Sequence, residues 1–258
     1  MSTEHVRRLA AHADALRALH RRGRPIPNAW DVASAKRFAK LGHLALATTS
    51  AGVANALGWA DGEAMPPDEM FAAVGRIAAA VDVPVSADLE AGYGLAPQDL
   101  VARVIASGCV GMNLEDSSHV SGKPTLVSAE ANAERVAAVK QAGRAAGVDL
   151  VLNARVDVFV REPLPGTTLS KVEEGIRRGR LYVEAGADCV YPIFAHDEQD
   201  VAALVEGIPG PVNILASPVA PPLARLAELG AARVTFGSLL MRQALGEAER
   251  VLGEYAAG

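Results

Sequence analysis

Acidic side chains follow two neighbouring apolar runs of the sequence, at the points where these runs stop. Asp88 and Glu90 come at the end of one run, and Glu115 and Asp116 come at the end of the next. Arg155 ends the apolar run after that. If these runs are the strands of a parallel α/β barrel, their carboxyl ends meet at one mouth. The sequence therefore predicts several carboxylates and one arginine around a common site, which suits a cation that holds an anion.

Oxygen ligands of this kind favour a hard divalent cation. Magnesium binds one or two carboxylates directly and keeps several waters, so we predict Asp88, Glu90 and Glu115 as its shell, with Mn²⁺ as an alternative ion. A 2-oxo carboxylate could chelate this ion, which would stabilise the enolate formed when a neighbouring bond breaks. The planar fork of Arg155 suits the substrate carboxylate.

A second candidate segment is Thr49-Ser50-Ala51-Gly52, which follows another apolar run. Its small side chains would let backbone amides approach an oxyanion, and Ser50 could add a hydroxyl donor. We also assign Asn213, at a later strand end, to the substrate-binding residues. Any one acidic residue at such a position is more typical of a helix cap, so the prediction depends on the grouping.

Apolar runs alternate with longer Ala-rich stretches of helical period, the pattern of a parallel sheet covered by helices. Eight runs are predicted as strands, at 25–29, 44–48, 84–89, 111–115, 150–155, 188–193, 211–215 and 233–236. Helices are predicted between them, among others at 67–80, 97–107, 129–146, 169–185 and 222–229. Eight strands close a (β/α)8 TIM-type barrel. We expect a single α/β-barrel domain over 1–258, with an extra helix at 1–20 and a last helix at 239–255.

Composition excludes several classes of partner. Lys and Arg total 25 against 30 for Asp and Glu, a net charge of -5, so we expect no nucleic-acid partner. No apolar run approaches the roughly 20 residues of a membrane span, so we expect no membrane partner. Charges interrupt the first 20 residues, which leaves no apolar signal core and favours a cytoplasmic protein. Cys109 and Cys189 lie in apolar segments, as buried reduced thiols do.

Five motifs resemble those of the isocitrate lyase and phosphoenolpyruvate mutase superfamily, in order along the chain. DLEAGYG at 88–94 is similar to its magnesium-binding Asp-x-Asp-x-Gly-Tyr-Gly stretch, with glutamate in place of the second aspartate. TTSAG at 48–52 and GWAD at 58–61 resemble its substrate loop and its Gly-x-Pro-Asp turn. NLED at 113–116 and NARVD at 153–157 resemble the strand ends that carry its metal-shell glutamate and its arginine. The similarity runs from about residue 25 to 245.

This resemblance implies a role for each matching residue. Asp88 would be the ligand nearest magnesium, while Glu90 and Glu115 would hold its waters. Asp61 would face the reacting end of the substrate. Ser50, Ala51 and Gly52 would hold a carboxylate or oxyanion opposite Arg155. Members of this family pack or exchange their last helix between subunits. The resemblance therefore implies that the helix at 239–255 can pack on or swap with a neighbouring subunit, and that the protein is a homodimer or homotetramer.

The chain departs from the family pattern in the loop after the fourth strand. Family lyases carry a cysteine there as the general acid, whereas this chain reads EDSSHVSGKPTL at 115–126. His119 and Lys123 lie in that loop and could donate the proton or close over the substrate. The histidine that phosphonate mutases carry after the sixth strand is replaced here by Tyr191-Pro192.

We therefore predict an enzyme that acts on a small 2-oxo or 2-hydroxy (di)carboxylate, as a carbon–carbon lyase or decarboxylase working through a metal-bound enolate. One alternative is phosphorus–carbon chemistry, as in a phosphonopyruvate mutase or hydrolase. The other is a barrel that binds a 2-oxo acid without turnover.

Overall fold

A closed ring of parallel strands forms the centre of the computed structural model, which describes residues 2–21, 23–120, 122–163 and 165–256. Six strands pair in the order β2-β3-β4-β5-β8-β9 and three in the order β1-β11-β10. A bridge between Val190 and Val212 joins β9 to β10, and the short β1 and β2 are successive parts of one segment. The eight predicted strand positions thus close the (β/α)8 barrel. The strands are β1 Arg24–Pro25, β2 Asn28–Ala29, β3 Leu46–Thr48, β4 Val85–Asp88, β5 Gly111–Glu115, β8 Val151–Val156, β9 Cys189–Pro192, β10 Asn213–Leu215 and β11 Arg233–Thr235.

The first predicted strand, 25–29, is divided between the two sheets. The amide of Ile26 donates to Val234 O on one side, and Pro27 O accepts from the amide of Ala47 on the other. Pro27 lacks an N–H and cannot continue the first ladder. The segment therefore changes neighbours within a few residues and joins the two ends of the sheet.

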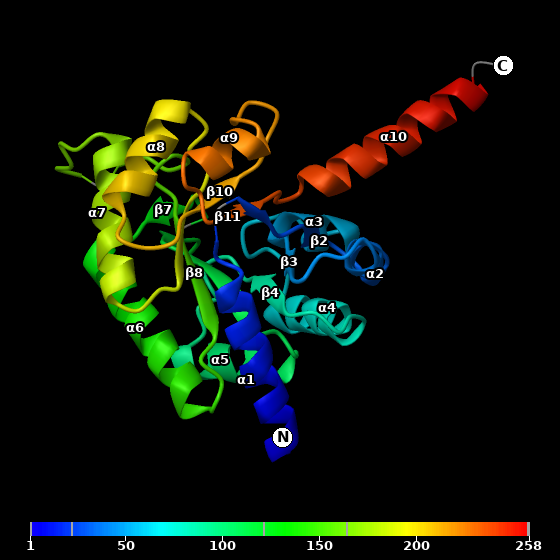
Figure 1. Cartoon of the computed structure of the whole chain (residues 1–258), viewed down its shortest axis with the longest axis horizontal. Helices are drawn as coiled ribbons and strands as arrows, with labels where there is room; N and C mark the ends of the chain where they lie inside the picture. Colours follow the sequence, from blue (N-terminus) through cyan, green and yellow to red (C-terminus); the bar gives the residue numbers. More distant parts are fainter. Residues whose placement is uncertain (1, 22, 121, 164, 257–258) are drawn as a thin grey trace.

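Helices cover the outside of the ring (Figure 1). They are α1 Thr3–Ala18, α2 Val32–Lys40, α3 Ser50–Ala56, α4 Pro67–Ala79, α5 Pro97–Ala106, α6 Ala129–Ala145, α7 Lys171–Glu184, α8 Glu198–Gly207, α9 Leu223–Glu228 and α10 Leu239–Ala256. None of the described helices is both long and apolar enough to cross a membrane.

Two segments predicted as loops have regular structure. Ser50 to Gly52 form the first turn of α3, because the Thr49 hydroxyl accepts a hydrogen bond from the Gly52 amide and caps the helix. The loop at 117–126 contains a short antiparallel pair, β6 Ser117–Ser118 with β7 Thr125–Leu126. Both corrections concern short elements with little apolar periodicity, which is why the sequence pattern does not indicate them.

The predicted extra N-terminal helix packs against the barrel. Leu9, Ala13 and Leu16 are buried, and Arg17 Nε donates to Asp188 Oδ1 at 2.7 Å. A Cβ at Gly111 would lie 2.8 Å from Val151 O and 2.9 Å from a methyl group of Leu16. Only glycine therefore lets α1 approach β5 this closely.

The last helix, α10, is the exception to this packing, because it projects away from the barrel (Figure 1). Met241 is its only buried residue within the described chain. Leu245, Leu252 and Tyr255 are 50%, 67% and 82% exposed. An apolar face of α10 is thus open in the single chain.

Candidate active site

A cavity of about 330 Å³ opens where the strands end. It brings together six of the residues predicted from the sequence: Thr49, Ser50, Ala51, Asp61, Asp88 and Arg155. These residues come from the ends of three different strands and from the 57–66 connection, so the barrel, rather than the local sequence, gathers them. A larger groove of about 850 Å³ lies between α1, α4 and α5 and is lined by none of the predicted residues.

Asp88 lies on the wall of this cavity with its carboxylate fixed by donors. Its Oδ2 accepts from the Ser50 amide at 3.0 Å and from the Ser50 hydroxyl at 3.1 Å. Its Oδ1 accepts from Asn113 Nδ2 at 3.1 Å, and its own amide donates to Thr48 Oγ1 at 2.9 Å. The N-terminus of α3 therefore faces the carboxylate of Asp88, where its amides favour negative charge.

Asn113 belongs to a polar chain inside the barrel that we did not predict. Asn153 Nδ2 donates to Asn113 Oδ1 at 2.8 Å, and both side chains are buried. The asparagines within otherwise apolar strands could have indicated these hydrogen bonds, since a buried amide needs partners. Asn113, which also lines the cavity, therefore holds Asp88, and Asn153 holds Asn113.

Four carboxylates crowd this end of the barrel. Burial, then Asp88, raises the pKa of Asp61. Burial, then the charges of Asp61, Asp88 and Glu115, raises the pKa of Glu90 to about 8. Like charges at short range disfavour simultaneous ionisation, so the cluster has an excess of negative charge that a cation would relieve.

Glu90 is held by Glu63, which the sequence did not single out, and by Tyr93, which lies in the DLEAGYG motif but was given no role. The Glu63 amide donates to Glu90 Oε2 at 2.6 Å, and the Tyr93 hydroxyl donates to Glu90 Oε1 at 3.0 Å. The Tyr93 amide in turn donates to Glu63 Oε1 at 2.5 Å. All three residues have positive φ, of 52°, 61° and 58° for Glu90, Glu63 and Tyr93. Such backbone is strained for these residue types and is often found at functional sites.

Glu115 lies between a histidine and an arginine. Its Oε1 contacts His119 Nε2, and its Oε2 lies 2.6 Å from Arg155 Nη1. The hydrogen bond to Glu115 raises the pKa of His119. His119 therefore lies beside the carboxylate cluster, in contact with Glu115.

These residues fit a magnesium ion through one direct ligand and bound waters. Among the described residues, no group of three or more His, Cys, Asp or Glu side chains is arranged to hold a metal ion by itself. Magnesium does not require such a cage, because it keeps several waters and one or two carboxylates. Asp88 at the cavity wall, with Glu90 and Glu115 behind it, matches that donor set.

Six predicted residues are not among those that line the cavity. Glu90, Glu115 and His119 make the contacts described above, and the other three are Gly52, Asn213 and Lys123. Gly52 is used in capping α3. Asn213 is fully buried, and its Nδ2 donates to Thr235 Oγ1 at 3.0 Å. Lys123 borders a separate hollow with Arg161 and Glu162. The structure thus places His119, but not Lys123, beside Glu115.

The far wall of the cavity was not predicted. Tyr191, Ile193 and Leu215 form a small apolar cluster there. Arg242, from the first turns of α10, also lines the cavity and has no side-chain partner among the described residues. The cavity therefore has a carboxylate-rich side, an apolar side and a second cation.

The sequence model of the phosphoenolpyruvate phosphomutase family matches residues 16–256, almost the whole chain. The chain belongs to this family, within the isocitrate lyase and phosphoenolpyruvate mutase superfamily. The resemblance found in the five motifs is thereby confirmed.

Similar proteins of the phosphomutase family carry names for different activities. An uncharacterized protein of Mycobacterium tuberculosis is 36% identical over 223 residues, covering 86% of this chain and 81% of that protein. The 2,3-dimethylmalate lyase of Eubacterium barkeri is 32% identical over 193 residues, which cover 71% of this chain and 63% of that protein. A crystal structure from Burkholderia cenocepacia J2315, provisionally described as a phosphonomutase, is 36% identical with a TM-score of 0.86, covering 95% and 99%.

Proposed function

We propose that this protein is a magnesium-dependent enzyme that acts on a small 2-oxo or 2-hydroxy (di)carboxylate, as a carbon–carbon lyase or decarboxylase. The observation that carries this proposal is the cavity that Asp88 shares with Asp61 and Arg155. The name of the relative that is a 2,3-dimethylmalate lyase supports the same reaction class.

Asp88, Glu90 and Glu115 would hold Mg²⁺, or Mn²⁺ in its place. When bound, the ion would withdraw electron density from the substrate oxygens and stabilise the negative charge that develops as the bond breaks.

The protein's own residues would bind and orient the substrate. Arg155 would donate to its carboxylate, and the Ala51 amide in the first turn of α3 would donate to a second oxygen, while the amide and hydroxyl of Ser50 hold Asp88. Asp61 would face the reacting carbon, where burial, then the charge of Asp88, raises its pKa. A distal carboxylate would reach Arg242, and an alkyl branch would contact Ile193 and Leu215.

His119 would supply the proton that the departing fragment takes up. Its contact with Glu115 favours the imidazolium, and a positioned histidine is the most frequent general acid of enzymes. Lys123 would then serve in closing the 117–126 segment over the cavity.

We further propose that the protein assembles as a homodimer or homotetramer through α10. The exposed Leu245 and Leu252 are seven residues apart and so share one face of the helix. A neighbouring copy would cover that face. The cytoplasmic location stays a prediction.

A proton-NMR assay with Mg²⁺ tests the proposed function. The panel would contain isocitrate, 2-methylisocitrate, 2,3-dimethylmalate, oxaloacetate and phosphonopyruvate. We expect chelator-sensitive cleavage of one of the carbon acids. Pyruvate from phosphonopyruvate alone would favour phosphorus–carbon chemistry, and magnesium-dependent binding without turnover of any compound would favour a binding protein.

A further inference from the structure

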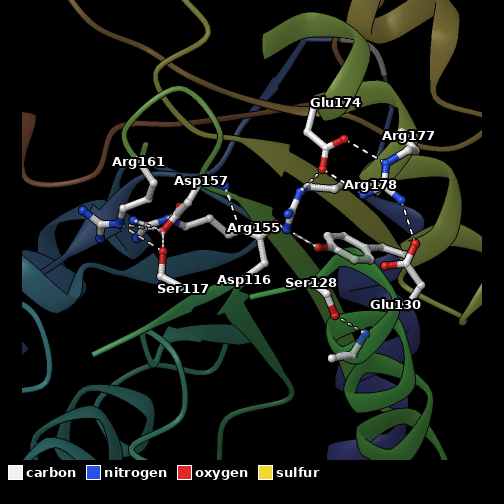
Figure 2. Close-up of polar contacts among 12 residues, drawn as sticks. Asp116, Ser117, Ser128, Glu130, Arg155, Asp157, Arg161, Glu174, Arg177 and Arg178 are labelled. Atoms are coloured by element: carbon white, nitrogen blue, oxygen red, sulfur yellow. Dashed lines mark hydrogen bonds and ion pairs between the residues drawn. The ribbon is translucent and has the colours of Figure 1, made fainter. Parts of the chain in front are cut away.

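Asp116 is a fully buried carboxylate directly after Glu115, and it is not among the residues that line the cavity. Its Oδ1 accepts from the Asp157 amide at 2.8 Å. Its Oδ2 accepts from Arg178 Nη1 at 2.8 Å and from the Tyr182 hydroxyl at 2.7 Å. Helix α7 thus holds Asp157, directly after β8, through the side chain of Asp116, directly after β5 (Figure 2).

Asp157, whose backbone is fixed in this way, holds the candidate substrate-binding arginine. Its Oδ1 accepts from Arg155 Nε at 2.6 Å and its Oδ2 from Arg155 Nη2 at 3.3 Å. The Ser117 hydroxyl donates to the same carboxylate. Asp157 therefore holds the Arg155 guanidinium on one side, opposite Glu115, and Asp116 fixes the backbone of Asp157.

Arg178, which binds Asp116 through Nη1, is also held through its Nε. It is fully buried, and its Nε donates to Glu174 Oε1 at 2.7 Å. Arg177 also binds Glu174, at 2.8 Å, but does not contact Asp116 and is partly exposed. Replacing a buried ion pair by apolar side chains of similar volume is often neutral or stabilising, so a buried pair is weak evidence for stability, and in some proteins it serves to fix one geometry.

We propose that Arg178 is a positioning residue for the site: through Asp116 and the backbone of Asp157 it fixes the guanidinium of Arg155 where a substrate carboxylate is bound. This inference rests on the proposed function of Arg155. A misplacement of about 1 Å at a site can lower the rate about 100-fold, so a residue outside the cavity can control binding within it.

The test measures ligand binding and therefore does not depend on finding the substrate. Oxalate presents two carboxylate oxygens to a divalent cation, as a 2-oxo acid does, and would be titrated calorimetrically into the protein with saturating Mg²⁺. The variants are Arg178→Met, Arg178→Lys and Tyr182→Phe, with Arg177→Met as the matched control. Affinity for Mg²⁺ alone would be measured separately for each protein.

We expect Arg178→Met to weaken oxalate binding by about 10-fold or more, while its affinity for Mg²⁺ alone changes by less than about 3-fold. Arg178→Lys, which keeps the charge, should recover most of the loss, and Arg177→Met should bind oxalate as the wild type does. If Arg178→Met does not fold, Tyr182→Phe carries the test, because it removes one hydrogen bond to Asp116 and no charge.

Two negative results are distinguishable. Equal oxalate affinity in the wild type and in the folded Arg178 and Tyr182 variants, with only a lower Tm, would overturn the positioning inference alone. Absence of magnesium-dependent oxalate binding in the wild type would overturn the proposed function and, with it, this inference.

Discussion

The guanidinium of Arg155 lies between two carboxylates, with Nη1 2.6 Å from Glu115 Oε2 and Nε 2.6 Å from Asp157 Oδ1. Burial disfavours its charge, but Asp157 and Glu115 outweigh that effect and raise the pKa of Arg155. The arginine therefore stays charged. A substrate carboxylate that binds to it has to share its N–H donors with Glu115.

The substitution Arg155→Lys should raise the KM of the substrate by about 10-fold to 100-fold, because a lysine cannot form a bidentate contact with a carboxylate while it is also held by Asp157. Steady-state kinetics on the substrate found in the NMR panel checks this, with thermal unfolding as the control for folding. A KM within about 2-fold of the wild type would assign Arg155 to the scaffold.

His119 and Lys123 lie in the same segment and form a matched pair. His119→Gln should lower kcat by about 100-fold or more with little change in KM, as expected for loss of a general acid. Lys123→Gln should have a smaller effect on kcat, since Lys123 borders a different hollow. The reverse order of effects would assign the proton donor to Lys123, and a change in KM alone at His119 would indicate gating.

The exposed face of α10 leads to a prediction about assembly. The wild type should be a dimer or tetramer by light scattering, and the double variant Leu245→Glu, Leu252→Glu should be a monomer, because charges on a buried helix face are costly. Glu247→Gln, on the opposite face of the same helix, is the control and should leave the assembly unchanged. A monomeric wild type at micromolar concentration would contradict the proposed role of α10.

His20 should make the protein less stable in mild acid. Burial, then the positive charge of Arg233, lowers the pKa of His20 to about 3. The unfolded chain takes up this proton below about pH 6.5, so the stabilisation is complete above that value and is lost as the pH falls toward 3. The loss is about 2 kcal/mol between about pH 7 and pH 5.

Urea unfolding of the wild type and of His20→Leu across this range measures the difference. The free energy of unfolding of the variant should fall less steeply with decreasing pH than that of the wild type. Parallel curves would show that His20 is protonated equally in the folded and unfolded states.

The strand-end residues could be predicted from the sequence because a parallel barrel brings all its carboxyl ends to one mouth. Asp88, Glu115 and Arg155 could be assigned to the site from their positions at the ends of three strands alone. Asn213 occupies a similar position but turns toward Thr235. Strand periodicity does not distinguish a side chain that reaches the mouth from one that fills the barrel below it.

The contacts that connect distant segments could not be predicted. Asp116 and Arg178 are 62 residues apart, and a sequence pattern does not indicate which buried charges will meet. Glu63 and Tyr93 depend on positive φ angles in two separate turns. Arg242 reaches the cavity only because α10 starts at its rim.

Magnesium titration of the wild type and of Asp88→Asn tests the proposed site most directly. The substitution keeps the size of the side chain and removes the charge that would bind the ion. We expect the variant to keep its fold, as judged by circular dichroism, and to lose more than about 10-fold in Mg²⁺ affinity together with all magnesium-dependent oxalate binding. Unchanged Mg²⁺ affinity in a folded Asp88→Asn protein would contradict the account.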